Sequence, residues 1–220
     1  YLGFFPYKEI LSQYPLPDFM RKLANFDGVH YLLIAQEGYR QYEQAFFPLY
    51  PLLIRLTTPL FFNNTLLAAL FISNLAFLFG LYWFSHLLKK YAVDNKMSVI
   101  SILLLFPTSF FFGAVYTEGL FFFLLVACLY FLHRQKYLTT TFFAFLASLT
   151  RLIGVFLIIP ILFYWLAKYQ KQVKNKHLRK PQRTNINRSC QLLPTNTLCL
   201  ITLFSPLLGL AVYSFYLYQT

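Results

Sequence analysis

Acidic side chains are scarce in this chain of 220 residues, which has 7 aspartates and glutamates against 19 lysines and arginines. Charged residues as a whole make up 12% of the chain, whereas soluble domains carry roughly 25%. Apolar residues reach 58% and aromatic residues 21%, so a water-soluble globule of this size could not bury its apolar surface. Disordered chains have low hydrophobicity, so the composition excludes disorder as well.

Cysteine is also scarce. The three cysteines, Cys128, Cys190 and Cys199, lie in or beside apolar runs, with no CxxC pair and no histidine spacing suited to zinc. We interpret them as apolar core residues and assign no metal ligand and no firm cofactor, while a role for a divalent cation stays open. The chain begins with Tyr1 in place of methionine and shows no signal peptide, so we expect it to be part of a longer protein.

The chain instead contains long, continuously apolar runs. A β-barrel would alternate apolar and polar residues, whereas these runs do not alternate. We therefore predict an all-α fold, a polytopic transmembrane helical bundle. A spanning helix needs about 20 apolar residues. The runs expected in the membrane are residues 66–88, 97–117 with a break at Pro107, 119–132, 137–167 and about 197–217.

The run over residues 137–167 is too long for one crossing. As a single helix its 31 residues would cover roughly 46 Å, against a hydrocarbon core of ~30 Å. Dividing it near Arg151 gives two helices and also places the basic segment that follows on the same side as the other basic loops. We therefore predict a hairpin at residues 150–154 and six membrane crossings.

The charged residues are distributed unequally between the two sides of the predicted bundle. Thirteen basic residues and one acid, Asp94, fall on one side, while six basic and six acidic residues fall on the other. By the positive-inside rule the thirteen are cytoplasmic, and their place in short loops argues against a nucleic-acid partner. We expect an extracytoplasmic loop with interfacial helices over residues 1–63 and a transmembrane domain over residues 64–220, with a basic cytoplasmic loop at 168–190.

Asp27 and His30 form the first candidate for chemistry. They are three residues apart, so they share one face of a helix that begins here, with Tyr31 alongside. A carboxylate beside an imidazole can act as a general base. Alternatively, Asp27 only caps the helix, whose end we expect at Gly38. Two ligands alone are a weak indication of a metal site.

Two further charges lie at or near membrane depth on the acidic side. Glu118 follows the helix break at Pro107 and begins the next helix, where it can also serve as a cap. Arg151 lies at the tip of the predicted hairpin, where a guanidinium is suited to bind a phosphate, or reaches only to the lipid headgroups. Earlier in the chain, residues 46–51 form an aromatic, proline-rich turn leading into an interfacial or partly buried helix within 45–62.

These segments, in this order, resemble the PIG-V family of mannosyltransferases, multi-pass membrane enzymes of the GT-C class. The resemblance covers residues 25–154 best. It departs at Phe26, where tryptophan is usual, and at Thr117, where serine is usual, and neither change removes a charge. The segments that carry it are FDGVHY at 26–31, IAQEGY at 34–39, FFPLYP at 46–51, FP at 106–107 with YTEGLF at 116–121, and TRLIG at 150–154.

The resemblance implies a GT-C-like fold and a glycosyltransferase. It would move mannose, or another hexose, from a polyprenyl- or dolichyl-phosphate donor to a lipid or glycan acceptor on the extracytoplasmic face, with inversion. Asp27 would be the general base, His30 would orient the hydroxyl or contact the phosphate, and Arg151 would bind the donor phosphate. The residues expected to bind sugar or acceptor are Glu118, which could also hold Arg151, and Tyr116, Tyr31 and Glu37.

Three alternatives stay open. A different GT-C enzyme would use another sugar or acceptor. A transporter or lipid flippase would place paired ionisable residues at mid-membrane, and a structural membrane subunit would use these charges only as caps and surface groups. The expected partners are the lipid-linked donor, the acceptor and membrane lipids. The topology fits a bacterial plasma membrane, which we favour, or the endoplasmic reticulum membrane of a eukaryote.

Overall fold

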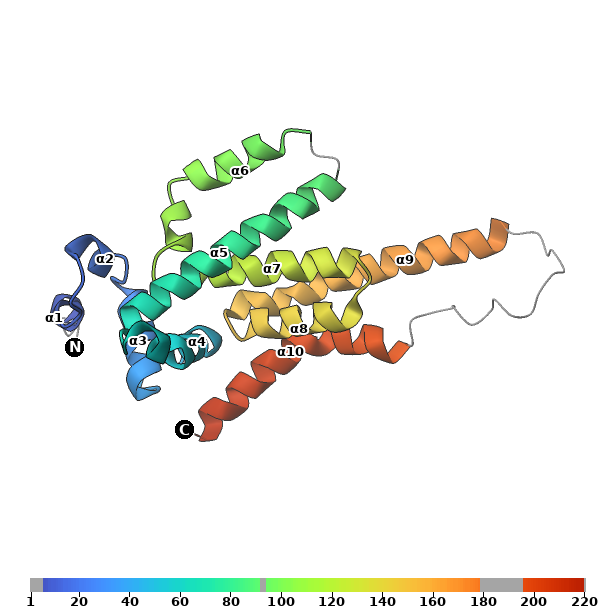
Figure 1. Ribbon diagram of the computed structural model, residues 1–220. Coiled ribbons are helices and arrows are strands. Elements are labelled where there is room, and N and C mark those ends of the chain that lie inside the picture. The colour runs from blue at the N-terminus through green and yellow to red at the C-terminus, as the bar shows by residue number, and fades with distance from the viewer. Residues whose placement is uncertain (1–5, 92–93, 179–195, 220) are drawn as a thin grey trace.

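The computed structural model describes residues 6–91, 94–178 and 196–219, and every regular element within these segments is helical. The all-α prediction is therefore confirmed (Figure 1). In chain order the elements are α1 (Tyr7–Ser12), α2 (Asp18–Lys22), α3 (Asp27–Glu37), α4 (Leu49–Thr57), η1 (Thr58–Phe61), α5 (Thr65–Lys90), α6 (Lys96–Leu105), η2 (Ser109–Phe112), α7 (Glu118–His133), α8 (Tyr137–Ser148), η3 (Leu152–Leu157), α9 (Ile158–Leu178) and α10 (Asn196–Gln219), where η marks a short 3₁₀ helix.

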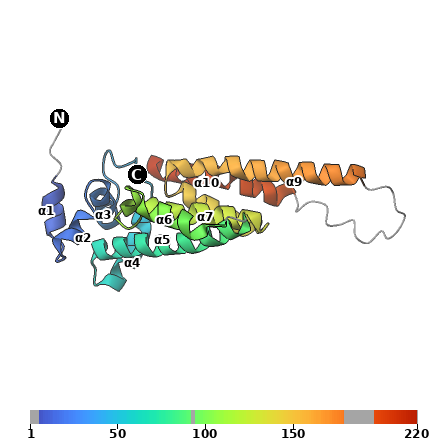
Figure 2. The same cartoon turned by 90° about the horizontal axis from the view of Figure 1, so that it is seen from above.

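The long helices lie side by side, and the short ones gather at one end. Helix α5 packs on α7, α7 on α8, and α8 on α10, while α9 continues from η3 alongside α10. Figures 1 and 2 both place α1–α4 at the same end of the bundle as the C-terminal turns of α10. The end of α5, the start of α6 and the turn between α7 and α8 lie at the opposite end (Figure 1), and they carry the basic residues Lys89, Lys90, Lys96, Arg134 and Lys136.

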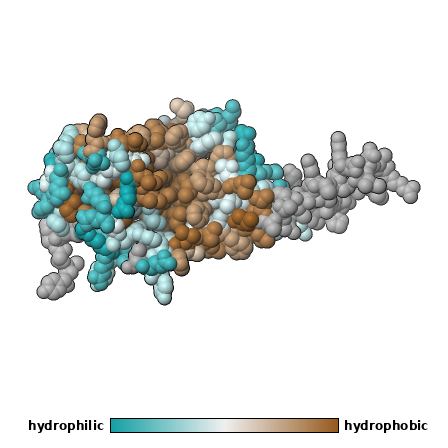
Figure 3. All heavy atoms as spheres, turned by 60° about the horizontal axis from the view of Figure 1, so that its bottom comes forward, coloured by the Kyte–Doolittle hydropathy of each residue, from teal (hydrophilic) through white to brown (hydrophobic). Residues whose placement is uncertain are grey.

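The outer surface of the bundle is apolar. Three helical stretches are long and apolar enough to cross a membrane: Thr65–Lys90, Leu152–Gln170 and Leu198–Gln219. Large apolar side chains such as Leu78, Ile102 and Phe163 are exposed. The face shown in Figure 3 has a hydrophobic zone beside the more hydrophilic end that carries α1–α4. An exposed apolar surface of this extent belongs in lipid, so the chain is an integral membrane protein.

Both helix breaks predicted from the sequence are present. Helix α6 ends at Leu105, and Phe106 is extended, with φ −65° and ψ 135°, because the ring of Pro107 disfavours a helical residue before it. The second break follows α8, where Arg151 is extended and η3 begins at the next residue. A Cβ at Gly154 would lie 2.3 Å from the carbonyl oxygen of Ala147, so only glycine lets the chain fold back this closely on α8.

The first part of the segment predicted as a basic loop at 168–190 is helical. Helix α9 continues through Leu178, because the residues after Lys168 include good helix formers and the first proline comes only at Pro181. Residues 179–195 lie outside the described part of the chain, and so does Cys190. Cys128 and Cys199 are free and buried, as expected for core residues.

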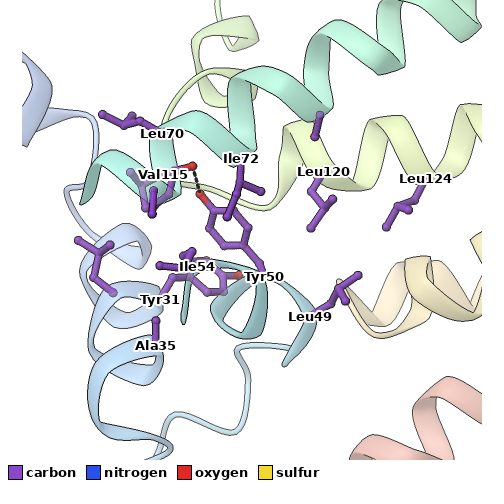
Figure 4. Close-up of a cluster of buried hydrophobic side chains, with 14 of the residues drawn as sticks. Tyr31, Ala35, Leu49, Tyr50, Ile54, Leu70, Ile72, Val115, Leu120 and Leu124 are labelled. Atoms are coloured by element: carbon purple, nitrogen blue, oxygen red, sulfur yellow. Dashed lines mark hydrogen bonds between the residues drawn. The ribbon is translucent and has the colours of Figure 1, made fainter. Parts of the chain in front are cut away.

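A buried tyrosine pair supports the end of the bundle where the short helices gather. Tyr50 of α4 is completely buried, and its hydroxyl shares a 2.7 Å hydrogen bond with the hydroxyl of Ser73 on α5. The ring of Tyr31 on α3 packs edge-on against Tyr50, with ring centres 5.2 Å apart. Figure 4 shows the two rings between α3, α4 and α5. The short helices are thus fixed to the spanning helices.

Candidate active site

The starts of α3 and α7 are held side by side by backbone contacts. The Val115 N–H donates to the carbonyl oxygen of Leu23 at 2.9 Å, and the Tyr116 hydroxyl donates to that of Asn25 at 2.8 Å. Gly28 lies so close that a Cβ there would be 3.0 Å from the Val115 carbonyl oxygen. Because α3 begins at Asp27 and α7 at Glu118, these contacts place the two helix starts beside each other, and both carboxylates act on the Tyr31 hydroxyl.

Asp27 is the first residue of α3, and its side chain is exposed. The interpretation of Asp27 as the N-cap is wrong, because Phe26 occupies the cap position and no side chain bonds the first turn. Phe26 has a φ of +58°, a strained conformation for an aromatic residue. Strain of this kind concentrates at functional sites. Asp27 therefore presents its carboxylate to solvent at a helix N-terminus, where negative charge is favoured.

Glu118 and Arg151 form an ion pair between α7 and the hairpin. The Arg151 Nη1 donates to Glu118 Oε1 at 2.6 Å, and the side chains are 40% and 28% exposed respectively. The predicted association of these two charges is confirmed. The other carboxylate oxygen, Glu118 Oε2, is buried and has no hydrogen-bond partner among the described residues. The pair thus leaves one acceptor unused, and Arg151 keeps further N–H donors on its guanidinium.

Tyr31 lies beneath these charges. It is 7% exposed, and its ring also packs edge-on against Phe46. Burial is the main reason why the pKa of Tyr31 is raised to about 12. The charges of Asp27 and Glu118 also raise this pKa, whereas a hydrogen bond to Thr117 and the charge of Arg151 lower it. Tyr31 therefore stays neutral and able to donate a hydrogen bond at physiological pH.

The same carboxylates raise the pKa of Tyr116. Burial, followed by the charges of Asp27, Glu118 and Tyr7, raises its pKa to about 12. The structure thus brings together five of the seven residues predicted to form a site: Asp27, Tyr31, Tyr116, Glu118 and Arg151. Of the other two, His30 faces the loop that follows α3, and Glu37 is the last residue of that helix.

His30 lies one turn after Asp27, on the side of the loop between α3 and α4. Its ring stacks on Phe46, with ring centres 4.9 Å apart. Its Nδ1 lies 3.4 Å from Oε1 of Glu43. Glu37, by contrast, is the last residue of α3, about 15 Å along the helix axis from Asp27. It pairs with Arg40.

Sequence reasoning missed Glu43 and Thr117. Glu43 belongs to the few acidic residues of the chain and lies between two segments that carry the family resemblance, which was a usable signal. Thr117 directly precedes Glu118, and nothing in its own residue type indicated a bond to Tyr31. As for metals, no group of three histidine, cysteine or acidic side chains forms in residues 6–91, 94–178 and 196–219.

An apolar cleft of about 430 Å³ opens at the same end of the bundle. Leu149, two residues before Arg151, forms part of its wall, and the Leu49 N–H bonds its carbonyl oxygen at 3.0 Å. The cleft lies between α3, α4 and α10, and such a space can hold part of a lipid chain. The remaining lining residues are Ile34, Gly38, Tyr39, Pro48, Pro51, Leu52, Arg55, Val212, Tyr213 and Tyr216.

Removing Arg151 is expected to destabilise the fold more than neutralising Glu118. Arg151→Met leaves the less exposed carboxylate of Glu118 without its partner, whereas Glu118→Gln leaves a guanidinium that water can solvate. We expect Arg151→Met to lower the free energy of unfolding by about 1–3 kcal/mol, and Glu118→Gln to lower it less. Thermal unfolding of the purified protein in detergent micelles measures both.

The double variant Arg151→Met/Glu118→Gln is the control for this pairing. Because it removes both charges, it should recover part of the stability lost in Arg151→Met. A double variant as unstable as the sum of the two single changes would show that the residues do not interact.

Comparison with known proteins agrees with this geometry. No curated protein and no solved structure matches the chain. The family model described as Mannosyltransferase (PIG-V), however, matches residues 10–220, nearly the whole length. The family resemblance seen in the sequence is thus confirmed, and the chain belongs to the PIG-V mannosyltransferase family, whose members are glycosyltransferases.

Proposed function

We propose that this protein transfers mannose, or a related hexose, from a polyprenyl- or dolichyl-phosphate donor to a hydroxyl of a lipid or glycan acceptor. The observation that carries the proposal is that α3, which begins at Asp27, starts beside α7, whose first residue Glu118 pairs with Arg151, at one end of an apolar bundle. A base, a cation and a second carboxylate are the groups that such a transfer needs. Membership of the PIG-V family supports this chemistry.

The reaction forms one bond and breaks one bond. The acceptor hydroxyl oxygen attacks the anomeric carbon of the donor sugar while Asp27 takes its proton. The bond between that carbon and the phosphate oxygen breaks, and the polyprenyl phosphate leaves with the electron pair. Because attack comes from the face opposite the leaving group, the anomeric configuration inverts.

Arg151 would stabilise the charge that develops on the leaving phosphate. Only its Nη1 is engaged by Glu118, so the remaining donors of the guanidinium can bind phosphate while the ion pair stays formed. The apolar cleft beside the hairpin supports a lipid-linked substrate.

The sugar would be held by the neighbouring polar groups. Glu118 Oε2, buried and without a partner among the described residues, can accept a hydrogen bond from a sugar hydroxyl. The neutral hydroxyls of Tyr31 and Tyr116 face the same charges. Glu37 lies too far along α3 to share this contact and would meet only a long acceptor.

The active end would face away from the cytoplasm. Six crossings would consist of α5, α6, α7, α8, the η3–α9 segment and α10, with the shorter helices crossing beside the three long ones. Basic residues at the end opposite Asp27 support this orientation by the positive-inside rule. It suits a bacterial plasma membrane, which we favour, or an endoplasmic reticulum membrane.

Asp27→Asn is expected to abolish sugar transfer while leaving expression intact. Asparagine keeps the size of the side chain but cannot take the proton, so turnover should fall by roughly 100-fold or more. The measurement is transfer of label from polyprenyl-phosphate-[³H]mannose to an acceptor, in membranes containing the full-length protein. The matched control is Asp18→Asn, which changes an exposed aspartate of α2 that pairs with Lys22.

Two outcomes of this assay would count against the proposal. A variant Asp27→Asn that turns over at nearly the wild-type rate would refute the assignment of the base. If the unmodified protein transfers no sugar from this donor or from other polyprenyl-phosphate sugars, the proposed reaction itself fails.

Arg151→Lys should weaken use of the donor. Lysine keeps the positive charge but loses the planar, multidentate donor set, so we expect the KM for the lipid-phosphate donor to rise about tenfold. Initial rates at varied donor and saturating acceptor measure this, with Arg21→Lys as the control, because Arg21 lies in α2 and pairs with Asp18 at 3.5 Å. An unchanged donor KM would contradict the assignment of Arg151.

The orientation can be tested with single cysteines in a chain whose own cysteines are replaced by alanine. A membrane-impermeant maleimide should label Tyr42→Cys, which is highly exposed, in intact cells. It should label Asn95→Cys and Gln170→Cys only after permeabilisation, because an even number of crossings separates these two sites. If Gln170→Cys reacts from outside while Asn95→Cys does not, the hairpin at Arg151 does not divide two crossings.

A further inference from the structure

The loop between α3 and α4 contains a carboxylate that the proposed chemistry does not use. Glu43 is 6% exposed and is the one acidic residue that is buried in the described part of the chain. A buried carboxylate is costly unless hydrogen bonds compensate it. Its two oxygens have separate partners: Oε2 accepts from the Arg40 N–H at 2.9 Å, and Oε1 lies 3.4 Å from Nδ1 of His30.

His30 is thereby held in two directions. An ionised Glu43 carboxylate has acceptors and no donor. In this pair the nitrogen that faces it, Nδ1, therefore carries the proton. The ring stacks on Phe46 at an interplanar angle of 18°, which fixes its plane. In the neutral ring, Nε2 is then the nitrogen without a proton and can accept a hydrogen bond.

We propose that Glu43 is a positioning residue, which holds His30 as the Nδ1–H tautomer so that Nε2 accepts a hydrogen bond from the acceptor hydroxyl. This inference rests on the proposed function, because the hydroxyl is the one that Asp27 deprotonates one helical turn away. In this arrangement His30 orients the hydroxyl toward the sugar and Asp27 takes its proton, so each group has one task.

A purely structural role for Glu43 would be to anchor the loop. The loop, however, has other anchors: the Tyr39 hydroxyl donates to the Phe46 carbonyl oxygen at 2.6 Å, and the Tyr213 hydroxyl of α10 donates to that of Gln44 at 2.8 Å. These bonds involve neither Glu43 nor His30. Tyr213→Phe therefore removes a loop anchor without touching the pair and serves as the matched control.

The kinetic test is a double-mutant cycle. Glu43→Leu removes both acceptors and should lower kcat roughly ten- to hundredfold with little change in donor KM. Glu43→Gln keeps one acceptor oxygen and should restore part of that loss. In a His30→Gln background, Glu43→Leu should cost nothing further, whereas Tyr213→Phe should have the same effect in both backgrounds. Equal losses from Glu43→Leu in both backgrounds would overturn the proposal in favour of loop anchoring.

A second measurement does not depend on activity. The chain has 4 histidines, so ¹⁵N-histidine NMR of the detergent-solubilised protein gives few signals, and His30→Gln identifies the one from His30. We expect the Nδ1–H tautomer in the unmodified protein and its loss in Glu43→Leu. An Nε2–H tautomer, or a signal that Glu43→Leu leaves unchanged, would refute the positioning role. If the spectra are as expected but the protein transfers no sugar, only the proposed function is refuted.

Discussion

The ion pair between Glu118 and Arg151 is the contact on which the candidate site depends. In a bundle whose outer surface is apolar, a lone charge at the edge of the lipid is costly, and pairing reduces that cost. The pair also joins the start of α7 to the tip of the hairpin after α8. Because the carbonyl oxygen of Leu149, directly before that hairpin, accepts from the Leu49 N–H at the start of α4, α4 is fixed to the same point.

Much of this fold could be predicted from hydropathy, one proline and the length of one apolar run. A helix in lipid must satisfy its own backbone hydrogen bonds, so each long apolar run had to be helical. Pro107 marked one break, and the excessive length of the run over residues 137–167 indicated the other. The end of α9 could not be found in this way. Hydropathy reports where the apolar stretch ends, at Gln170, whereas the helix itself continues as far as Leu178.

The candidate site was predictable to the extent that charge is rare in this chain. Asp27, Glu118 and Arg151 stood out because few other charges lie near apolar runs, and the structure brings them together. Glu43 was missed because its burial results from tertiary packing of the loop around His30, which no local pattern encodes. Glu37 was chosen for its place in a motif, and helix geometry puts it at the far end of α3.

The position of the site follows from the solubility of the proposed substrates. A lipid-linked sugar stays in the membrane and a glycan hydroxyl comes from water, so they can meet only where the helices end. There the chain can also adopt conformations that lipid would not tolerate, such as the positive φ of Phe26 and the extended Arg151. Asp27 and Glu118 are each the first residue of a helix, where the partial positive charge of the N-terminus favours carboxylate ions. The helix ends therefore supply both the location of the charges and part of their stabilisation.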